Sequence, residues 1–288
     1  MLAGEQLLPR DVLDRDYTAR ATVSAADFDR IMGLYQSLSD KAHALPHGRP
    51  GLQFCAETGL QLDLFGTVPG EKRPLVMFIH GGYWRALARG QSAFAAPMLA
   101  AQGIACAVPD YRLAPGASIT EIIGDCRRAL AWLWHNAEAL GIDRGRILVT
   151  GSSAGGHLAA AVAQPGWQAG HGLPDQPLCA CLPVSGLFEL APLAASHVND
   201  WMRFTPEEIS ASPLRHPPQG LPGALALAAG AGEVPGFHRQ TAAFAGATGW
   251  PVHEIADRNH FDVILDLAQP DTTLSRLVLD LLRQDRPA

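Results

Sequence analysis

Residues 147–163 read ILVTGSSAGGHLAAAVA and place a motif of small residues between two regular elements. The apolar run 147–150 is typical of a buried strand, and the Ala- and Leu-rich run after Gly155 is typical of a helix. Gly151 and Gly155 enclose Ser153, and they allow a tight turn that lifts its side chain above the end of the strand. Because the positive end of the following helix favours negative charge there, we predict that Ser153 is a nucleophile.

The sequence on both sides of this motif alternates between strand and helix patterns. Short apolar runs bounded by Gly and Pro alternate with amphipathic segments, which predicts crossover units and a mostly parallel sheet with helices on both faces. The expected strands are a hairpin at 52–56 and 60–65, followed by 75–79, 104–108, 147–150, 178–184, 224–229 and 250–255. The expected helices are 91–101, 119–140, 154–163, 237–247 and 271–284.

Two segments depart from this alternation. Residues 1–50 predict an N-terminal arm that packs on the main domain, residues 51–288, through a helix starting near Ser24. Its apolar residues recur at helical spacing, and we interpret them as core packing: Phe28, Ile31, Met32, Leu34, Tyr35 and Leu38. Residues 187–220 are rich in proline and predict a small cap inserted across the carboxyl edge of the sheet.

Composition excludes several classes of protein. The chain has 288 residues, 48% of them hydrophobic, which suits one large domain with a sheet buried on both faces. A net charge of −6 with scattered basic residues argues against nucleic-acid binding and against a polybasic membrane anchor. The N-terminus lacks the pattern of a signal peptide and no apolar run approaches the length of a membrane span, so we expect a cytoplasmic protein.

A serine nucleophile needs a base and an acid that orients the base. His260 follows the last predicted strand, where a catalytic histidine would come late in the chain, and we predict that it is the base. Glu233 follows the preceding strand and is the predicted acid, with Asp257 as the alternative. These residues gather if the carboxyl ends of parallel strands lie along one edge of the sheet.

An oxyanion hole would complete the site. One donor is expected to be the backbone N–H of Ala154, the residue after the nucleophile. The others are expected from the sequence HGGYW at residues 80–84, directly after the strand 75–79, because glycines let a loop turn its N–H groups inward. We interpret His80 as a residue that braces this loop, not as a catalyst or a metal ligand.

With HGGYW, the serine motif and a late histidine, the chain resembles the α/β-hydrolase superfamily, and within it the arylformamidase (kynurenine formamidase) family. Further segments that resemble this family are DYTAR at 16–20, DYRLAP at 110–115, SGLF at 185–188, SPL at 212–214, GAGE at 230–233, FHRQ at 237–240 and NHFD at 259–262. The resemblance runs from about residue 10 to 285. It departs from many relatives at Ser152, where they carry a histidine before the nucleophile.

The resemblance implies a triad of Ser153, Glu233 and His260, with oxyanion N–H groups from Gly82, Tyr83 and Ala154. It implies hydrolysis of an N-formyl aryl amide, with N-formyl-L-kynurenine as the expected substrate, and no metal or cofactor. A metal-dependent formamidase is disfavoured because the sequence has no His/Asp cluster with the spacing of metal ligands. The expected partner is a small aromatic amide or ester, and a homodimer is compatible with the sequence.

An aryl leaving group needs apolar surface, and we expect it from Trp84, Trp201, Met202 and Phe204, with Ser152 beside the nucleophile influencing selectivity. Two other functions stay open. The same framework serves carboxylesterases and arylesterases, which differ from an amidase only in substrate preference. A catalytically inactive binding module is the remaining alternative, although the complete set of serine, acid, histidine and HGGYW argues against it.

Overall fold

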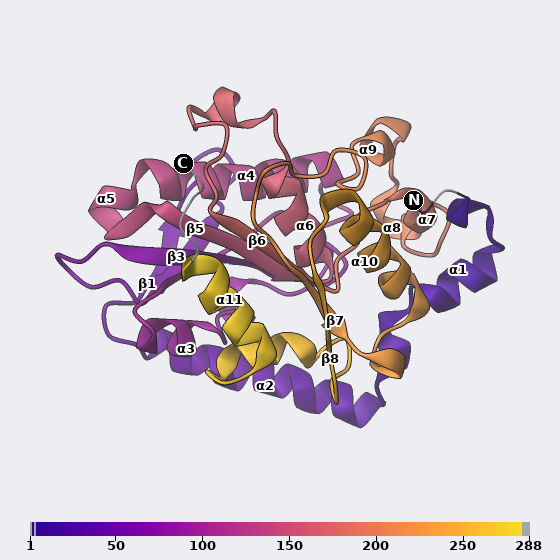
Figure 1. Cartoon of the computed structure of the whole chain (residues 1–288), viewed down its shortest axis with the longest axis horizontal. Helices are drawn as coiled ribbons and strands as arrows, with labels where there is room; N and C mark the ends of the chain where they lie inside the picture. The colour runs from indigo at the N-terminus through magenta and orange to yellow at the C-terminus, as the bar shows by residue number, and fades with distance from the viewer. Residues whose placement is uncertain (1, 3, 284–288) are drawn as a thin grey trace.

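The computed structural model describes residues 2 and 4–283, in which eight strands form one central sheet (Figure 1). Their order across the sheet is β1-β2-β4-β3-β5-β6-β7-β8. The strands span Arg49–Gln53 (β1), Gln61–Phe65 (β2), Arg73–Ile79 (β3), Ala105–Pro109 (β4), Ile142–Ser152 (β5), Ala180–Val184 (β6), Leu225–Ala228 (β7) and Val252–Ile255 (β8).

The strand pairing is antiparallel at one end of the sheet and parallel elsewhere. β1 and β2 form an antiparallel hairpin and β2 pairs antiparallel with β4, whereas all pairs from β4–β3 to β7–β8 are parallel. The predicted hairpin and the mostly parallel sheet are therefore confirmed. Ile79 at the end of β3 pairs with Gly151 near the end of β5, so the loops that follow these strands lie side by side.

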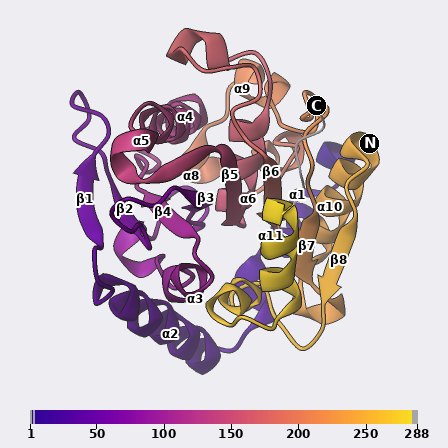
Figure 2. The ribbon, with the colours of Figure 1, turned by 60° about the vertical axis from the view of Figure 1, so that its left-hand side comes forward.

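Helices cover both faces of the sheet (Figure 2). One face carries α4, α5, α6 and α10, and the opposite face carries α2, α3 and α11. These helices span Ile119–His135 (α4), Ala137–Leu140 (α5), Ala154–Ala163 (α6), Pro235–Thr248 (α10), Ala25–His43 (α2), Ala96–Ala101 (α3) and Thr273–Arg283 (α11). Short 3-10 turns are η1 (Glu5–Leu7), η2 (Ala19–Thr22), η3 (Arg89–Gln91), η4 (Gln168–His171), η5 (Gly230–Gly232) and η6 (Val263–Ala268).

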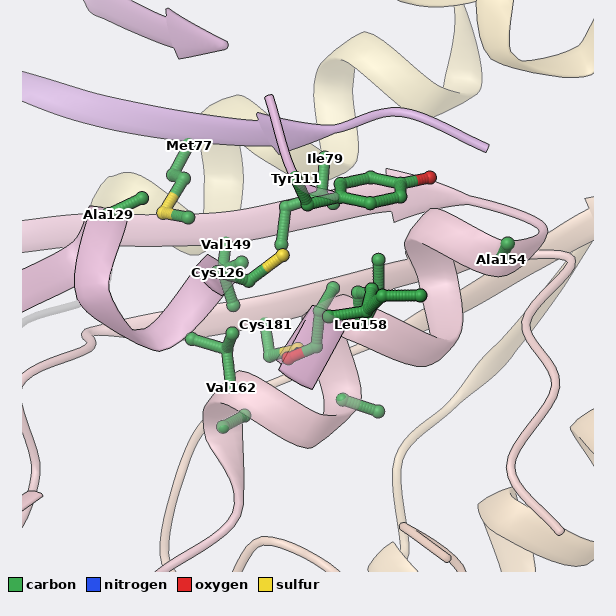
Figure 3. Close-up of a cluster of buried hydrophobic side chains, with 14 of the residues drawn as sticks. Met77, Ile79, Tyr111, Cys126, Ala129, Val149, Ala154, Leu158, Val162 and Cys181 are labelled. Atoms are coloured by element: carbon green, nitrogen blue, oxygen red, sulfur yellow. The ribbon is translucent and has the colours of Figure 1, made fainter. Parts of the chain in front are cut away.

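The core under α4 and α6 fixes the position of the serine motif (Figure 3). Ala154, Leu158 and Val162 follow one another at four-residue spacing along α6, so that they share the face that packs on the sheet. They meet side chains from α4, β3, β5 and β6 in one buried cluster, among them Cys126, Met77, Val149 and Cys181. Burial of this face holds the first turn of α6 rigidly above the sheet.

An N-terminal arm, which includes α2, and one insertion add further helices to this framework. The N-terminal arm contains α1 (Arg10–Asp16) and continues through η2 into α2, which begins after Ser24, whose side chain accepts a hydrogen bond from the N–H of Asp27 at 3.1 Å. The insertion between β6 and β7 contains α7 (Ala191–Ala194), α8 (Asn199–Met202) and α9 (Pro206–Ser210). η1 of the arm packs against α7 of the insertion.

Several elements have other bounds than the sequence predicts. The first strand of the hairpin spans Arg49–Gln53 and not 52–56, and the helix predicted at 91–101 begins only at Ala96, after η3. The helix predicted at 119–140 is interrupted at Asn136, whose side-chain amide donates to the carbonyl of Trp132 at 2.8 Å and separates α4 from α5. The strand predicted at 147–150 is longer and begins at Ile142. None of the helices in the described part of the chain is long and apolar enough to cross a membrane.

Candidate active site

Ser153 lies at the sharp turn between β5 and α6. Its backbone adopts φ 58° and ψ −119°, a region that residues with a side chain rarely occupy. The turn is stabilised because the N–H of Ser153 donates to the carbonyl of Val184 on the neighbouring strand at 2.9 Å. A Cβ on Gly155 would lie 2.0 Å from the carbonyl oxygen of Ile79, and one on Gly151 would lie 2.5 Å from the same atom. Only glycine at both positions lets the two strand ends approach this closely.

His260 and Glu233 form a buried pair beside this turn. The Nδ1 atom of His260 lies 2.9 Å from each carboxylate oxygen of Glu233, and both residues are less than 5% exposed. One of these oxygens also accepts the N–H of Val234 at 3.0 Å. Because Nδ1 faces the carboxylate, the carboxylate favours the tautomer that leaves Nε2 free to accept a proton.

Backbone contact brings the two loops of this pair together. A Cβ on Gly232 would lie 2.0 Å from the carbonyl oxygen of Arg258, so glycine is needed for the turn after β7 to touch the loop after β8. The ring of Phe237, at the start of α10, lies edge-on to the imidazole of His260 with 4.6 Å between ring centres. The histidine ring is thus held between a carboxylate and an aromatic edge.

The HGGYW loop lies next to Ser153 and has an unusual backbone. Gly82, Tyr83 and Trp84 all have positive φ angles, and a Cβ on Gly82 would lie 2.3 Å from the carbonyl oxygen of Ala86. Among the described residues, the N–H groups of Gly82 and Tyr83 have no hydrogen-bond acceptor. The N–H of Ala154, as the first residue of α6, has no partner within the helix.

His80 braces this loop as expected. Its ring stacks on Tyr111 with 4.1 Å between centres, and its Nδ1 lies 3.0 Å from the carbonyl oxygen of Gly81. The hydroxyl of Tyr111 donates to the carbonyls of both His80 and Gly81. Burial lowers the pKa of His80 to about 4, so its imidazole is neutral near pH 7.

A cavity of about 330 Å³ opens over these groups. Ser152, Ser153, His260 and the loop residues His80 to Tyr83 line one part of it. Further lining comes from Phe78, Arg85, Ala86, Leu87, Ser92, Phe261 and Ile264, and from the N-terminal arm through Ala19, Arg20, Phe28, Met32 and Tyr35. The structure therefore brings the predicted nucleophile and base to one cavity, with Glu233 behind the base.

Comparison with known proteins supports a hydrolase. Kynurenine formamidase of Salmo salar is 26% identical over 88% of this chain and 85% of that protein. A solved structure from Silicibacter sp. TM1040, provisionally assigned as a thioesterase, has a TM-score of 0.77 at 27% identity and covers 93% of this chain and 98% of that one. The protein is an α/β-hydrolase.

Two further matches concern the central part of this α/β-hydrolase. The BD-FAE family model matches residues 62–169, which include the HGGYW loop and the serine turn. Carboxylesterase NlhH of Mycobacterium tuberculosis is 42% identical over 93 residues, which is 32% of this chain and 29% of that protein. The resemblance to the arylformamidase family noted from the sequence is confirmed by the formamidase match, which extends over most of the hydrolase.

The sequence predicts that Trp84, Trp201 and Phe204 line the cavity. The structure shows that none of the three does. Trp84 is fully buried and packs edge-on against Phe204 and His157. Trp201 donates its indole N–H to the carbonyl of Tyr83 at 3.2 Å and so braces the HGGYW loop from behind. Met202 is buried in the same core. Ser152 does line the cavity, as expected.

The N-terminal arm supplies the apolar wall of the cavity that the sequence predicts from Trp84 and the insertion. Core packing is confirmed for Ile31 and Tyr35 of this stripe, and Met32 and Leu38 pack against the same core. Phe28, Met32 and Tyr35 also line the cavity, which the sequence does not predict, and Leu34 is exposed. The Tyr35 hydroxyl donates to the carbonyl of Phe261 at 2.7 Å, and the rings of Phe28 and Phe261 meet edge-on. The DYTAR segment at 16–20 was the available signal, because Ala19 and Arg20 line the cavity.

The arm is also fixed to the loop beside the nucleophile. The Tyr83 hydroxyl donates to the carbonyl of Tyr17, and burial holds the pKa of Tyr83 well above its ordinary value, so the phenol keeps its proton. The Tyr17 hydroxyl in turn donates to Glu5 and accepts from Gln240 of α10, each at 3.0 Å.

Within residues 2 and 4–283, no group of three or more His, Cys, Asp and Glu side chains could hold a metal ion.

Proposed function

We propose that this α/β-hydrolase cleaves the formyl–nitrogen bond of an N-formyl aryl amide, with N-formyl-L-kynurenine as the expected substrate. Ser153 would be the nucleophile, His260 the base and Glu233 the acid that orients it. The observation that carries the proposal is the close approach of Glu233 to Nδ1 of His260, at 2.9 Å, behind a cavity that His260 shares with Ser153. That is the order of groups that activates a serine hydroxyl.

In the first half of the reaction, the hydroxyl oxygen of Ser153 attacks the formyl carbon while Nε2 of His260 takes the hydroxyl proton. The carbonyl oxygen becomes an alkoxide, which the N–H groups of Gly82, Tyr83 and Ala154 would stabilise by about 3 kcal/mol or more for each donor. His260 then gives its proton to the nitrogen of the leaving amine. The C–N bond breaks, the aromatic amine departs and Ser153 carries a formyl ester.

In the second half, His260 takes a proton from water as the water oxygen attacks the formyl carbon. The second alkoxide collapses, the ester bond to Ser153 breaks, and His260 returns the proton to the serine oxygen. Formic acid leaves and the enzyme returns to its starting state. In both halves Glu233 stabilises the imidazolium that forms and remains a carboxylate itself.

The choice of an aryl formamide is supported by the sequence match and by the apolar lining of the cavity. The match to kynurenine formamidase of Salmo salar extends over most of both chains, whereas the match to carboxylesterase NlhH covers about a third of this one. Phe28, Met32 and Phe261 give the cavity an apolar wall suited to an aromatic ring. A small-molecule aromatic amide is therefore the partner that we propose.

The test is kcat/KM for N-formyl-L-kynurenine beside p-nitrophenyl acetate, with wild-type protein and with Ser153→Ala. A strong preference for the formamide is expected, and the substitution should reduce kcat for both substrates by roughly five to six orders of magnitude. Circular dichroism and the melting temperature of the variant should match the wild type.

Two outcomes would contradict the proposal in different ways. Ester turnover without formamide turnover, lost in Ser153→Ala, would retain the serine and replace the formamidase by an esterase, which the NlhH match favours. Absence of turnover with both substrates, together with no labelling of Ser153 by a fluorophosphonate, would favour an inactive binding module.

A further inference from the structure

The charged side chains around the cavity are all basic. Within the described chain the lining includes no Asp or Glu, although the protein as a whole has a net charge of −6. Arg20 and Arg85 contribute its two permanent positive charges, and both side chains are exposed, so they lie where the cavity opens to solvent. A cationic opening in an acidic protein selects ligands by charge.

Arg20 belongs to η2 of the arm and is held over the aromatic wall. Its guanidinium carbon lies 4.5 Å from the centre of the Phe28 ring, and Nη1 donates to the carbonyl of Val23 at 2.7 Å. These contacts use one of its five N–H groups and orient the planar guanidinium. Its other N–H groups make no hydrogen bond within the described chain.

Arg85 belongs to the chain that follows the HGGYW loop and is held from the insertion. Its guanidinium carbon lies 3.7 Å from the centre of the Trp201 ring, and Trp201 is itself fixed by its hydrogen bond to the carbonyl of Tyr83. Trp201, which does not line the cavity, therefore positions a residue that does. Stacking leaves the edge of the guanidinium free for an anion.

Neither arginine has a carboxylate partner among the described residues. By contrast, Arg239 of α10, close to the same arm, bonds both Glu5 and Asp16 at less than 3 Å. An exposed cation without an ion pair costs little free energy by itself. Two such cations lining one apolar cavity are free to bind an anionic group.

We propose that Arg20 and Arg85 form a carboxylate-binding subsite that makes the hydrolase selective for aryl substrates whose leaving group carries a carboxylate. The planar guanidinium fork matches a carboxylate in two parallel hydrogen bonds. The identity of the scissile bond rests on the proposed function. The charge selectivity does not, because it concerns the opposite end of the ligand from the bond that breaks.

The experiment compares an anionic and a neutral substrate with the same scissile bond. The formamide pair is Nα-acetyl-N′-formyl-L-kynurenine, whose acetylated α-amine carries no charge, and its carboxamide. The ester pair is 4-acetoxybenzoate and its methyl ester, and turnover of both esters is measured by release of acetate. For each pair the charge preference is kcat/KM of the anion divided by that of the neutral compound. Because each variant is compared with the wild type, intrinsic differences in leaving-group reactivity cancel.

Arg20→Met and Arg85→Met keep the length of the side chain and remove its charge. Each should reduce the charge preference roughly tenfold or more, chiefly through KM of the anion, since a hydrogen bond between charged groups has that magnitude. Arg20→Lys and Arg85→Lys should retain part of the preference. Arg276→Ala removes one exposed positive charge from α11, away from the cavity, and should leave the preference at the wild-type value.

The outcomes separate this inference from the proposed function. If the ester pair shows an anion preference that both Arg→Met variants lose, while neither formamide reacts, the subsite stands and the formamidase proposal fails. If formamides react but the preference is unchanged in both Arg→Met variants, the subsite is overturned and the formamidase proposal stands. If Arg276→Ala reduced the charge preference as much as the Arg→Met variants do, the cause would be the net charge of the protein, and the subsite would also be overturned.

Discussion

The carboxyl edge of the sheet and the N-terminal arm meet at one cavity, but they are held there in different ways. At the sheet edge the backbone itself is in contact, as the glycines at 151, 155 and 232 show, and no side chain can be added at those positions. The arm is attached mainly through side chains, with Tyr17, Tyr35 and Phe28 as its anchors, and its backbone approaches α10 closely only at Gly236, where a Cβ would lie 2.6 Å from the carbonyl oxygen of Asp16. Backbone contact gives the precision that bond breaking requires, whereas side-chain docking can vary and sets what the cavity accepts.

The largest loss of activity is expected at the sheet edge, from substitution of the acid Glu233. Glu233→Gln should lower kcat by roughly three to four orders of magnitude, because an amide cannot stabilise the imidazolium and favours the wrong tautomer of His260. Asp257→Asn is the matched control for the alternative acid. Asp257 is exposed, and asparagine tolerates its φ of 57°. The activity of the Asp257→Asn variant should therefore stay near the wild-type value.

The contrary result would be equally clear. If Asp257→Asn lost most of its activity and Glu233→Gln lost little, Asp257, on the same loop as His260, would be the acid. Single-turnover kinetics with N-formyl-L-kynurenine, or with p-nitrophenyl acetate, would measure both variants.

A second prediction concerns acid sensitivity behind the sheet edge. Burial lowers the pKa of His80 to about 4, and burial with the nearby charge of Arg127 lowers the pKa of His157 to about 3. An unfolded chain binds these protons from about pH 6.5 downward, so folding is favoured above that pH and is weakened as the pH falls toward 4 and then 3. Between pH 7.5 and pH 4.5 the loss in the free energy of unfolding is on the order of 3 kcal/mol for each histidine.

Urea unfolding at pH 7.5 and pH 4.5 measures this loss, with His157→Leu as the variant. Neither ring nitrogen of His157 has a hydrogen-bond partner among the described residues, so leucine removes no such bond. The variant should lose less stability between the two pH values than the wild type does. An equal loss in both proteins would show that His157 does not contribute.

A third prediction separates the arm from the insertion. Phe28→Ala should raise KM for an aryl substrate roughly tenfold, because Phe28 lines the cavity and its apolar surface is lost to the ligand. Phe204→Ala should lower the melting temperature and leave KM unchanged, because Phe204 packs on the buried Trp84 instead. Steady-state kinetics and calorimetry on both variants check the contrast. A raised KM in Phe204→Ala but not in Phe28→Ala would show that the insertion, and not the arm, contacts the aryl group.

The smallest effect is expected within the docking network of the arm. Tyr17→Phe removes a buried hydroxyl, but Glu5 remains bonded to Arg239 and Gln240 remains bonded to the carbonyl of Glu189. Each partner keeps another hydrogen bond, so the cost in free energy of unfolding should be about 1 kcal/mol. Urea unfolding measures it at pH 7.5. A cost several times larger, with KM raised in parallel, would mean that the arm depends on this one hydroxyl for its position.

The parts of the site that the sequence predicts are those with a local cause. Ser153 could be located because a strand, two glycines and a helix follow one another within 17 residues, and His80 could be interpreted as a brace because it precedes two glycines at the end of a strand. Glu233 and His260 were found because each follows a strand, and the ends of parallel strands share one edge.

Periodicity and turn chemistry act over a few neighbouring residues, so the sequence predicts the sheet, its crossover connections and the residues at its carboxyl edge. The folded chain is needed to show that Phe28, Met32 and Tyr35 face a cavity and that Trp201 supports Arg85 from outside it. An apolar stripe on a helix has the same pattern whether it covers a core or a ligand. The difference arises from where the arm docks, which depends on contacts between residues more than 200 positions apart, such as Tyr35 with Phe261 and Gln240 with Tyr17.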